Sequence, residues 1–158
     1  MNISMTQLFE AAGILAVVIS LLFVAYQIQQ ANLIARVTTE YEIRNNHAEF
    51  NQSIFTNPDI ASFLGSKFDP PAESGMTQGE YVQGIAFAIR SINIWTAAET
   101  AFKNGMLSES TYNFMIDDIR YTLAADPGMR LFYRDTIAVF PSQSGMDVIK
   151  LATEIVAP

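Results

Sequence analysis

The chain has 158 residues, 50% of them hydrophobic, and its 16 acidic and 9 basic residues leave a net charge of −7. This length is enough for one domain with a modest core. The acidic balance argues against binding to nucleic acid or to anionic lipid headgroups, since both need clustered Lys and Arg. The absence of cysteine excludes disulfides, thiol catalysis and thiolate metal sites.

An almost uninterrupted apolar stretch covers residues 8–26 and predicts a membrane-spanning helix. Glu10 is its only charge and lies near one end, where a carboxylate reaches water or headgroups. Tyr26 suits the interfacial belt at the other end and is followed by the polar Gln27. A cleaved signal peptide would need a basic segment before the stretch and an A-x-A-like site after it, and neither occurs. A buried core helix would need a larger protein around it.

Residues 1–28 are therefore expected to form a transmembrane anchor, and residues 29–158 a soluble helical domain. Both Arg36 and Arg44 follow the span and nothing basic precedes it, so the positive-inside rule favours a cytoplasmic domain, with a periplasmic one as the alternative.

Small residues recur along one face of the predicted anchor. Ala12, Ala16 and Ser20 are four residues apart, and Gly13 lies beside them. This small-xxx-small pattern lets two helices approach closely in lipid and predicts a packing face for a partner helix or a second copy. The alternative is chance, because alanine is common in any apolar run.

No Gly or Pro occurs between Gly13 and Pro58, so the membrane helix is expected to continue as the first helix of the soluble domain. Two neighbouring apolar stripes predict that several helices cover this extension. One stripe contains Ile43, His47, Phe50 and Ile54, and the other contains Ile34, Val37, Tyr41, Ala48 and Phe55. Pro58 opens a short helix that Gly65 ends, and residues 66–75 are expected to form a loop.

Thr77 and Glu80 have the spacing of a capping box and predict the start of a helix that ends near residue 104. Its apolar residues lie almost all the way round, which is typical of the central helix of a bundle. A second membrane span is the alternative, but three polar side chains disfavour it. These are Arg90, Asn93 and Glu99.

Three further helices are expected after residue 105. Ser108 caps the first, whose core stripe is Tyr112, Met115, Ile116, Ile119 and Leu123, with Asp117, Asp118 and Arg120 facing solvent. Asp126 as N-cap and Pro127 open the next, which is expected to bury Met129, Phe132, Tyr133, Ile137 and Phe140. A turn over residues 141–145 precedes the last helix, with Val148, Ile149, Ala152, Ile155 and Val156 inside. No stretch alternates like a strand, so the predicted fold is all-α, with five to six helices in the bundle.

Catalytic and metal-binding patterns are largely missing from the sequence. His47 is the only histidine, whereas a di-iron bundle site needs two Glu-x-x-His motifs and a zinc site needs Cys or His ligands. A core or interface histidine bonded to a backbone carbonyl is therefore favoured over a catalytic one. Trp95 is expected in the core, since no cluster of polar groups accompanies it. We predict no metal, no cofactor and no enzymatic activity.

The junction SLLFVAYQIQQANLIAR, with Gln27-Ile28 and then Asn32, resembles a group of uncharacterised bacterial single-pass membrane proteins. Gly105-Met-Leu-Ser108 before Tyr112, and FYRDTIAVF followed by Pro-Ser, are also similar. Where that group often has tryptophan near Tyr112 and Phe132, this chain has Tyr and Phe. The resemblance implies an anchor in the bacterial cytoplasmic membrane and a helical domain, and it brings no functional residues.

These observations together predict a membrane-anchored helical interaction or scaffolding module. Its partners would be the lipid bilayer and a larger membrane protein complex, in which it is an accessory subunit, or a second copy of the chain. The alternative is a membrane-tethered small-ligand sensor with a cavity between the long first helix and the helix over residues 77–104. A fully packed interior around Trp95 would count against that alternative.

Overall fold

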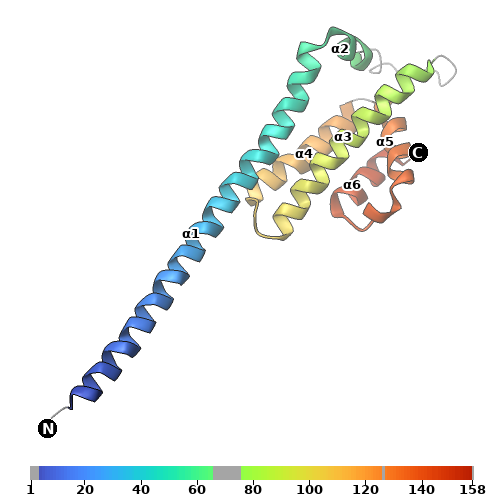
Figure 1. Ribbon diagram of the computed structural model, residues 1–158. Helices are drawn as coiled ribbons and strands as arrows, with labels where there is room; N and C mark the ends of the chain where they lie inside the picture. Colours follow the sequence, from blue (N-terminus) through green and yellow to red (C-terminus); the bar gives the residue numbers. More distant parts are fainter. Residues whose placement is uncertain (1–3, 66–75, 126, 158) are drawn as a thin grey trace. The chain divides into compact units, whose positions relative to one another are not determined.

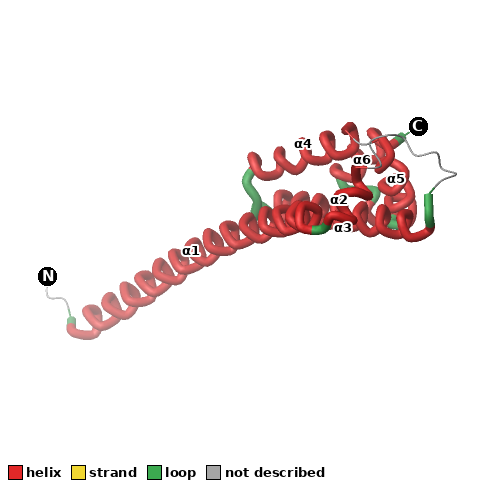
Figure 2. Tube along the Cα trace, turned by 90° about the horizontal axis from the view of Figure 1, so that it is seen from above, coloured by secondary structure: helices red, strands yellow, loops and turns green. Residues whose placement is uncertain are grey.

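The computed structural model describes residues 4–65, 76–125 and 127–157 of the chain. Six α-helices and no strand occur in these ranges, which confirms the predicted all-α fold (Figures 1 and 2). The chain divides into two units, Met1–Thr38 and Thr39–Pro158. The predicted loop over residues 66–75 and the predicted N-cap Asp126 lie outside the described residues.

The first unit contains the beginning of α1 (Met5–Thr56), with the predicted anchor. Every side chain over residues 4–34 is exposed, including large apolar ones such as Phe9, Leu22 and Phe23. In the described part of the chain, α1 is the one helix long and apolar enough to cross a membrane. Its apolar segment differs from the core helix of a soluble protein, because none of it is buried.

The second unit contains the end of α1, which packs on the bundle through a single face. Ile43 and Phe50 are buried on this face, as predicted. Tyr41 and Ala48, on the neighbouring stripe, are exposed, so the prediction that several helices cover both stripes is wrong. The reason is that the side-chain contacts of α1 in this unit, to α3 (Gln78–Lys103) and α4 (Glu109–Ala125), come from the face that carries Ile43 and Phe50.

The short helix α2 (Pro58–Gly65) begins where the sequence predicts. Asn57 caps it, because its Oδ1 accepts the backbone N–H of Asp59 at 3.0 Å and that of Ile60 at 3.3 Å. Pro58 occupies the first helical position, where its missing N–H costs nothing.

α3 is the centre of the bundle and packs on α4, α5 (Arg130–Val139) and α6 (Asp147–Val156). The predicted capping box starts it, since Thr77 Oγ1 accepts the N–H of Glu80 and Glu80 accepts the N–H of Thr77. Along most of its length it is covered as predicted. Tyr81 and Val82, near its first turn, are exposed and depart from the prediction.

The bundle core contains the apolar stripes predicted for α4 and α6. Trp95 and Tyr133 stack at its centre, with ring centroids 5.3 Å apart. A short 3₁₀ helix, Pro127–Met129, leads into α5, and another, Pro141–Gln143, forms the predicted turn before α6. Phe140 was predicted to be buried and is 41% exposed, because it follows the end of α5 and no longer lies on its inner face.

Gly84 of α3 lies directly against Phe132 of α5. A Cβ at this position would overlap the ring of Phe132, which is fully buried beside it. The absence of a side chain therefore lets the two helices approach over an aromatic ring.

Replacing Gly84 by Ala should destabilise the second unit by about 1–3 kcal/mol, because the added methyl overpacks the core against Phe132. Thermal unfolding in mild detergent, followed by circular dichroism, measures the effect. Gly79→Ala is the matched control in the same helix, since its nearest neighbour would be Thr77 Oγ1 at 3.9 Å. An equal loss in both variants would contradict this account of Gly84.

Candidate binding trough between α1 and α3

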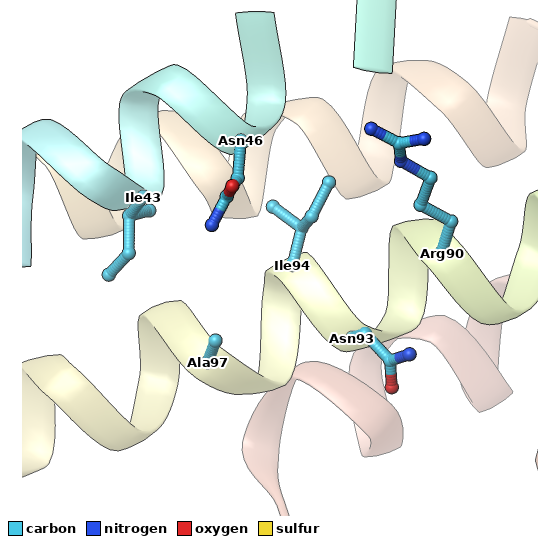
Figure 3. A pocket seen from close by; sticks show the side chains of 6 residues that line it. All are labelled: Ile43, Asn46, Arg90, Asn93, Ile94 and Ala97. Carbon is cyan, nitrogen blue, oxygen red and sulfur yellow. The ribbon is translucent and has the colours of Figure 1, made fainter. Parts of the chain in front are cut away.

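Three adjoining hollows lie between the end of α1 and α3 in the second unit, and we call them together the α1–α3 trough. The middle hollow has a volume of about 230 Å³. Ile43 and Asn46 extend into it from α1 toward α3, and Ile94 extends from α3 toward α1 (Figure 3). Arg90, Asn93 and Ala97 complete its lining.

The two outer hollows share lining residues with the middle one, so the three form a continuous line. The hollow near α2 has a volume of about 310 Å³ and shares Arg90 with the middle hollow. Its apolar wall contains Phe50, Ile54, Ile60, Ala86 and Phe87. The third hollow, of about 580 Å³, shares Ile43 and Asn46 with the middle one and is more polar, with Glu42 on its rim.

Arg90 is the charged group at the junction of the first two hollows. Its guanidinium lies over the ring of Phe50, 5.2 Å from the ring centroid, and Phe50 in turn packs on Phe87. Every other basic side chain described in the second unit has a carboxylate or a carbonyl partner. Among the described residues, no acceptor pairs with the N–H donors of Arg90, which leaves them available to an acceptor on a bound molecule.

A cluster of hydrogen-bonded polar side chains joins α1 to the start of α4. The carboxylate of Glu40 accepts hydrogen bonds from the hydroxyls of Ser108 (3.1 Å) and Thr111 (2.6 Å), and it pairs with Arg44 at 3.1 Å. Arg44 also donates to Thr111. The hydrogen bond from Thr111, followed by those from Ser108 and Arg44, lowers the pKa of Glu40 despite its partial desolvation.

Asp118 connects α1, α3 and α4. Its Oδ2 accepts the indole N–H of Trp95 at 2.8 Å, and its Oδ1 lies 3.2 Å from Nε2 of His47. In the tautomer that carries its proton on Nε2, His47 donates to Asp118 and accepts from Asn51 at Nδ1, 3.3 Å away.

Two sequence predictions are corrected by this network. Asp118 was predicted on the solvent face of α4 and instead points inward, because it accepts from the buried Trp95 and lies against the half-buried His47. His47 was predicted to bond to a backbone carbonyl, and its partners are the side chains of Asp118 and Asn51. Trp95 is 1% exposed, as predicted for a core residue.

Asp118→Ala should destabilise the second unit by about 1–3 kcal/mol, because it leaves the indole N–H of Trp95 and the ring N–H of His47 without an acceptor. Asp117→Ala, one residue earlier on the exposed side, should change stability by less than about 0.5 kcal/mol. Trp95 is the only tryptophan, so its fluorescence reports unfolding directly. Equal effects of the two variants would refute the role given to Asp118.

A fully buried carboxylate, Glu99, holds α6 against α3. Its side chain is fully buried and accepts the backbone N–H groups of Asp147 (3.0 Å) and Val148 (2.8 Å) at the start of α6. Lys103 pairs with Glu99 and with Asp147. Burial alone raises the pKa of Glu99, but the hydrogen bonds from Lys103, Val148 and Asp147 outweigh it and lower the pKa overall.

The stability that Glu99 contributes should therefore be present above its ordinary pKa of 4.5 and be lost as the pH falls through its lower folded pKa. Glu99→Gln should cost about 2 kcal/mol at pH 7, because the charge-assisted bonds to Lys103 and α6 weaken. Melting curves between pH 7 and 3 should show the deficit shrinking below pH 4.5. Glu154→Gln, an exposed change on α6, is the control. A deficit that does not depend on pH would contradict the assignment.

The residues predicted for membrane contact all lie on the exposed surface of α1. Ala12, Gly13, Ala16 and Ser20 remain a predicted packing face, and the hydroxyl of Ser20 donates to the carbonyl of Ala16 at 2.8 Å. A Cβ on Gly13 would meet nothing within 4 Å.

The interfacial residues predicted at the two ends of the span, Glu10, Tyr26 and Gln27, are exposed as well. The hydroxyl of Tyr26 accepts a hydrogen bond from Gln30 at 2.7 Å. Their position at a membrane interface stays a prediction.

His47 and Trp95 were singled out from the sequence, and the alternative prediction placed a cavity between the long first helix and the helix over residues 77–104, where the trough lies; the residues that line the trough were not identified. Arg90 and Asn93 were visible as polar residues in an apolar helix, and they were used only to argue against a second membrane span. Their place in the lining of the trough depends on how α1 packs, which the spacing does not determine. Among the described residues, no group of three or more His, Asp or Glu side chains is placed to hold a metal ion.

No known protein family, curated protein or solved structure matches the chain. The resemblance to bacterial single-pass proteins therefore stays a prediction, and function is argued from the structure alone.

Proposed function

We propose that this chain is a membrane-anchored helical interaction module, an accessory subunit of a larger membrane protein complex or a homo-oligomer. The observation that carries the proposal is the apolar part of α1, whose side chains are exposed on all faces over residues 4–34. Exposed apolar surface costs roughly 25 cal/mol per Å² in water, so a helix apolar on every side is stable only in lipid or against other proteins.

The second unit supports an interaction role, because it carries an unfilled trough and no catalytic constellation in the described residues. His47 lies between Asp118 and Asn51, and among the described residues no Ser or Thr hydroxyl and no Lys amine is hydrogen-bonded to it for activation as a nucleophile. By the positive-inside argument, Arg36 and Arg44 favour the cytoplasmic side for this unit, with the periplasmic side as the alternative.

A small-ligand sensor is the second candidate, and the hollow of about 310 Å³ between α1 and α3 is the observation that favours it. This volume lies at the lower end of the range for small-molecule sites. The interior beside Trp95 is packed against Tyr133 and Asp118, so a ligand would have to bind in the trough and not in the bundle core.

The first test is native-size analysis of the full chain, extracted from its own membranes in mild detergent, with mass spectrometry of comigrating proteins. Migration within a stoichiometric complex is expected. Migration as a free monomer would refute the proposal and favour the ligand sensor, which ligand-induced shifts in melting temperature would then test.

The anchor is tested in the same preparation by Val18→Arg combined with Leu22→Arg. Each arginine at the centre of a span costs about 2.5–3.5 kcal/mol, so the variant should be released from the membrane by alkaline carbonate, whereas the unaltered chain should stay. Tyr41→Arg, an exposed change in the second unit, is the control. Release of the unaltered chain would refute membrane insertion.

A further inference from the structure

The trough has the form of a rod-shaped binding site. Its lining on α1 runs from Thr39 to Ile54, about four helical turns or roughly 22 Å at 1.5 Å per residue. The three hollows lie in line and open to solvent, whereas small-molecule sites are single concave cavities that enclose most of the ligand. The shape therefore suits a helix laid along the surface more than a compact ligand.

The chemistry of the trough changes along its length. The end near α2 is apolar, with Phe50 and Phe87, and the middle combines Ile43 and Ile94 with the amide of Asn46. An amphipathic helix can bury apolar side chains at the first end and place polar ones against the amides.

Two charged side chains of opposite sign, Arg90 and Glu42, determine which charged residues a helix bound in the trough must have. Arg90, over the ring of Phe50, has no carboxylate partner, and Glu42 on the rim of the third hollow has no basic partner among the described residues. Arg90 lies over Phe50, and Glu42 precedes Phe50 by eight residues on α1. The charges of Glu42 and Arg90 therefore lie roughly 12 Å apart along the axis of α1. This rise corresponds to two turns of a bound helix.

Building on the proposed function, we infer that the α1–α3 trough binds an amphipathic helix of a partner protein that carries an acidic and a basic residue about two turns apart. The acidic residue pairs with Arg90 and the basic residue with Glu42. The apolar face of the partner helix packs on the accessible apolar side chains at the end near α2, Ile54 and Ala86.

Photo-crosslinking in the native membrane tests this inference. A benzophenone amino acid replaces Asn93 in the trough of the full chain, and in a second variant it replaces Asp117 on the exposed side of α4. The crosslinked peptide is then sequenced. We expect a segment of another protein with the stated charge spacing, and we expect it only from the Asn93 position.

Charge reversal then tests the pairing. Arg90→Glu should reduce the yield of this crosslink about tenfold, Arg120→Glu on α4 should not change it, and exchanging the acidic residue of the partner for Lys should restore it in the Arg90→Glu chain. Circular dichroism of each variant confirms that the bundle is folded.

Crosslinks from Asn93 to lipid, to a small molecule or to a second copy of this chain would overturn the inference, as would an absent crosslink or a yield insensitive to Arg90→Glu. If native-size analysis still finds a complex in these cases, the proposed function stands and the trough is not its docking site. If no complex is found, the proposed function itself fails.

Discussion

Polar side chains fasten α1 to the bundle, and the trough depends on this mode of attachment. Glu40 binds the start of α4, and His47 reaches Asp118, which also holds Trp95. These bonds hold α1 against α4, while the apolar side chains of α1 and α3 do not interlock along their whole length. Hollows therefore remain between Ile43 and Ile94, where close packing at the density of a protein core would have filled the space.

The other wall of the trough is built differently. α3 is also held by contacts within the bundle that do not involve α1, with Trp95 stacked on Tyr133 and the carboxylate of Glu99 bonded to the first N–H groups of α6. Removing either partner of such a buried bond is costly, so α3 is a firm support. One wall of the trough, α3, is thus held in place by buried contacts, and the other wall, α1, is held by partly exposed polar contacts.

The sequence predicted the elements well because their signals are local. The capping box at Thr77, the proline at residue 58 and the apolar period of α4 each act within one or two helical turns. A cavity between these two helices was the alternative prediction, but the residues that line the trough could not be predicted, because they depend on which face of α1 meets α3. The orientation of Asp118 could not be predicted from the sequence either. Its spacing places it beside Asp117 on α4, and only the packed structure shows that it points inward toward Trp95 and His47, which lie on other helices.

The stacking of Arg90 on Phe50 has a consequence for the entropy of binding at the proposed docking site. A free arginine side chain samples many rotamers and loses that freedom when it binds, which costs up to about 2 kcal/mol. The aromatic ring already restricts Arg90 in the unbound chain. In the proposed complex, part of this entropic penalty is therefore met during folding, and recognition of the partner's carboxylate would begin from a pre-organised guanidinium.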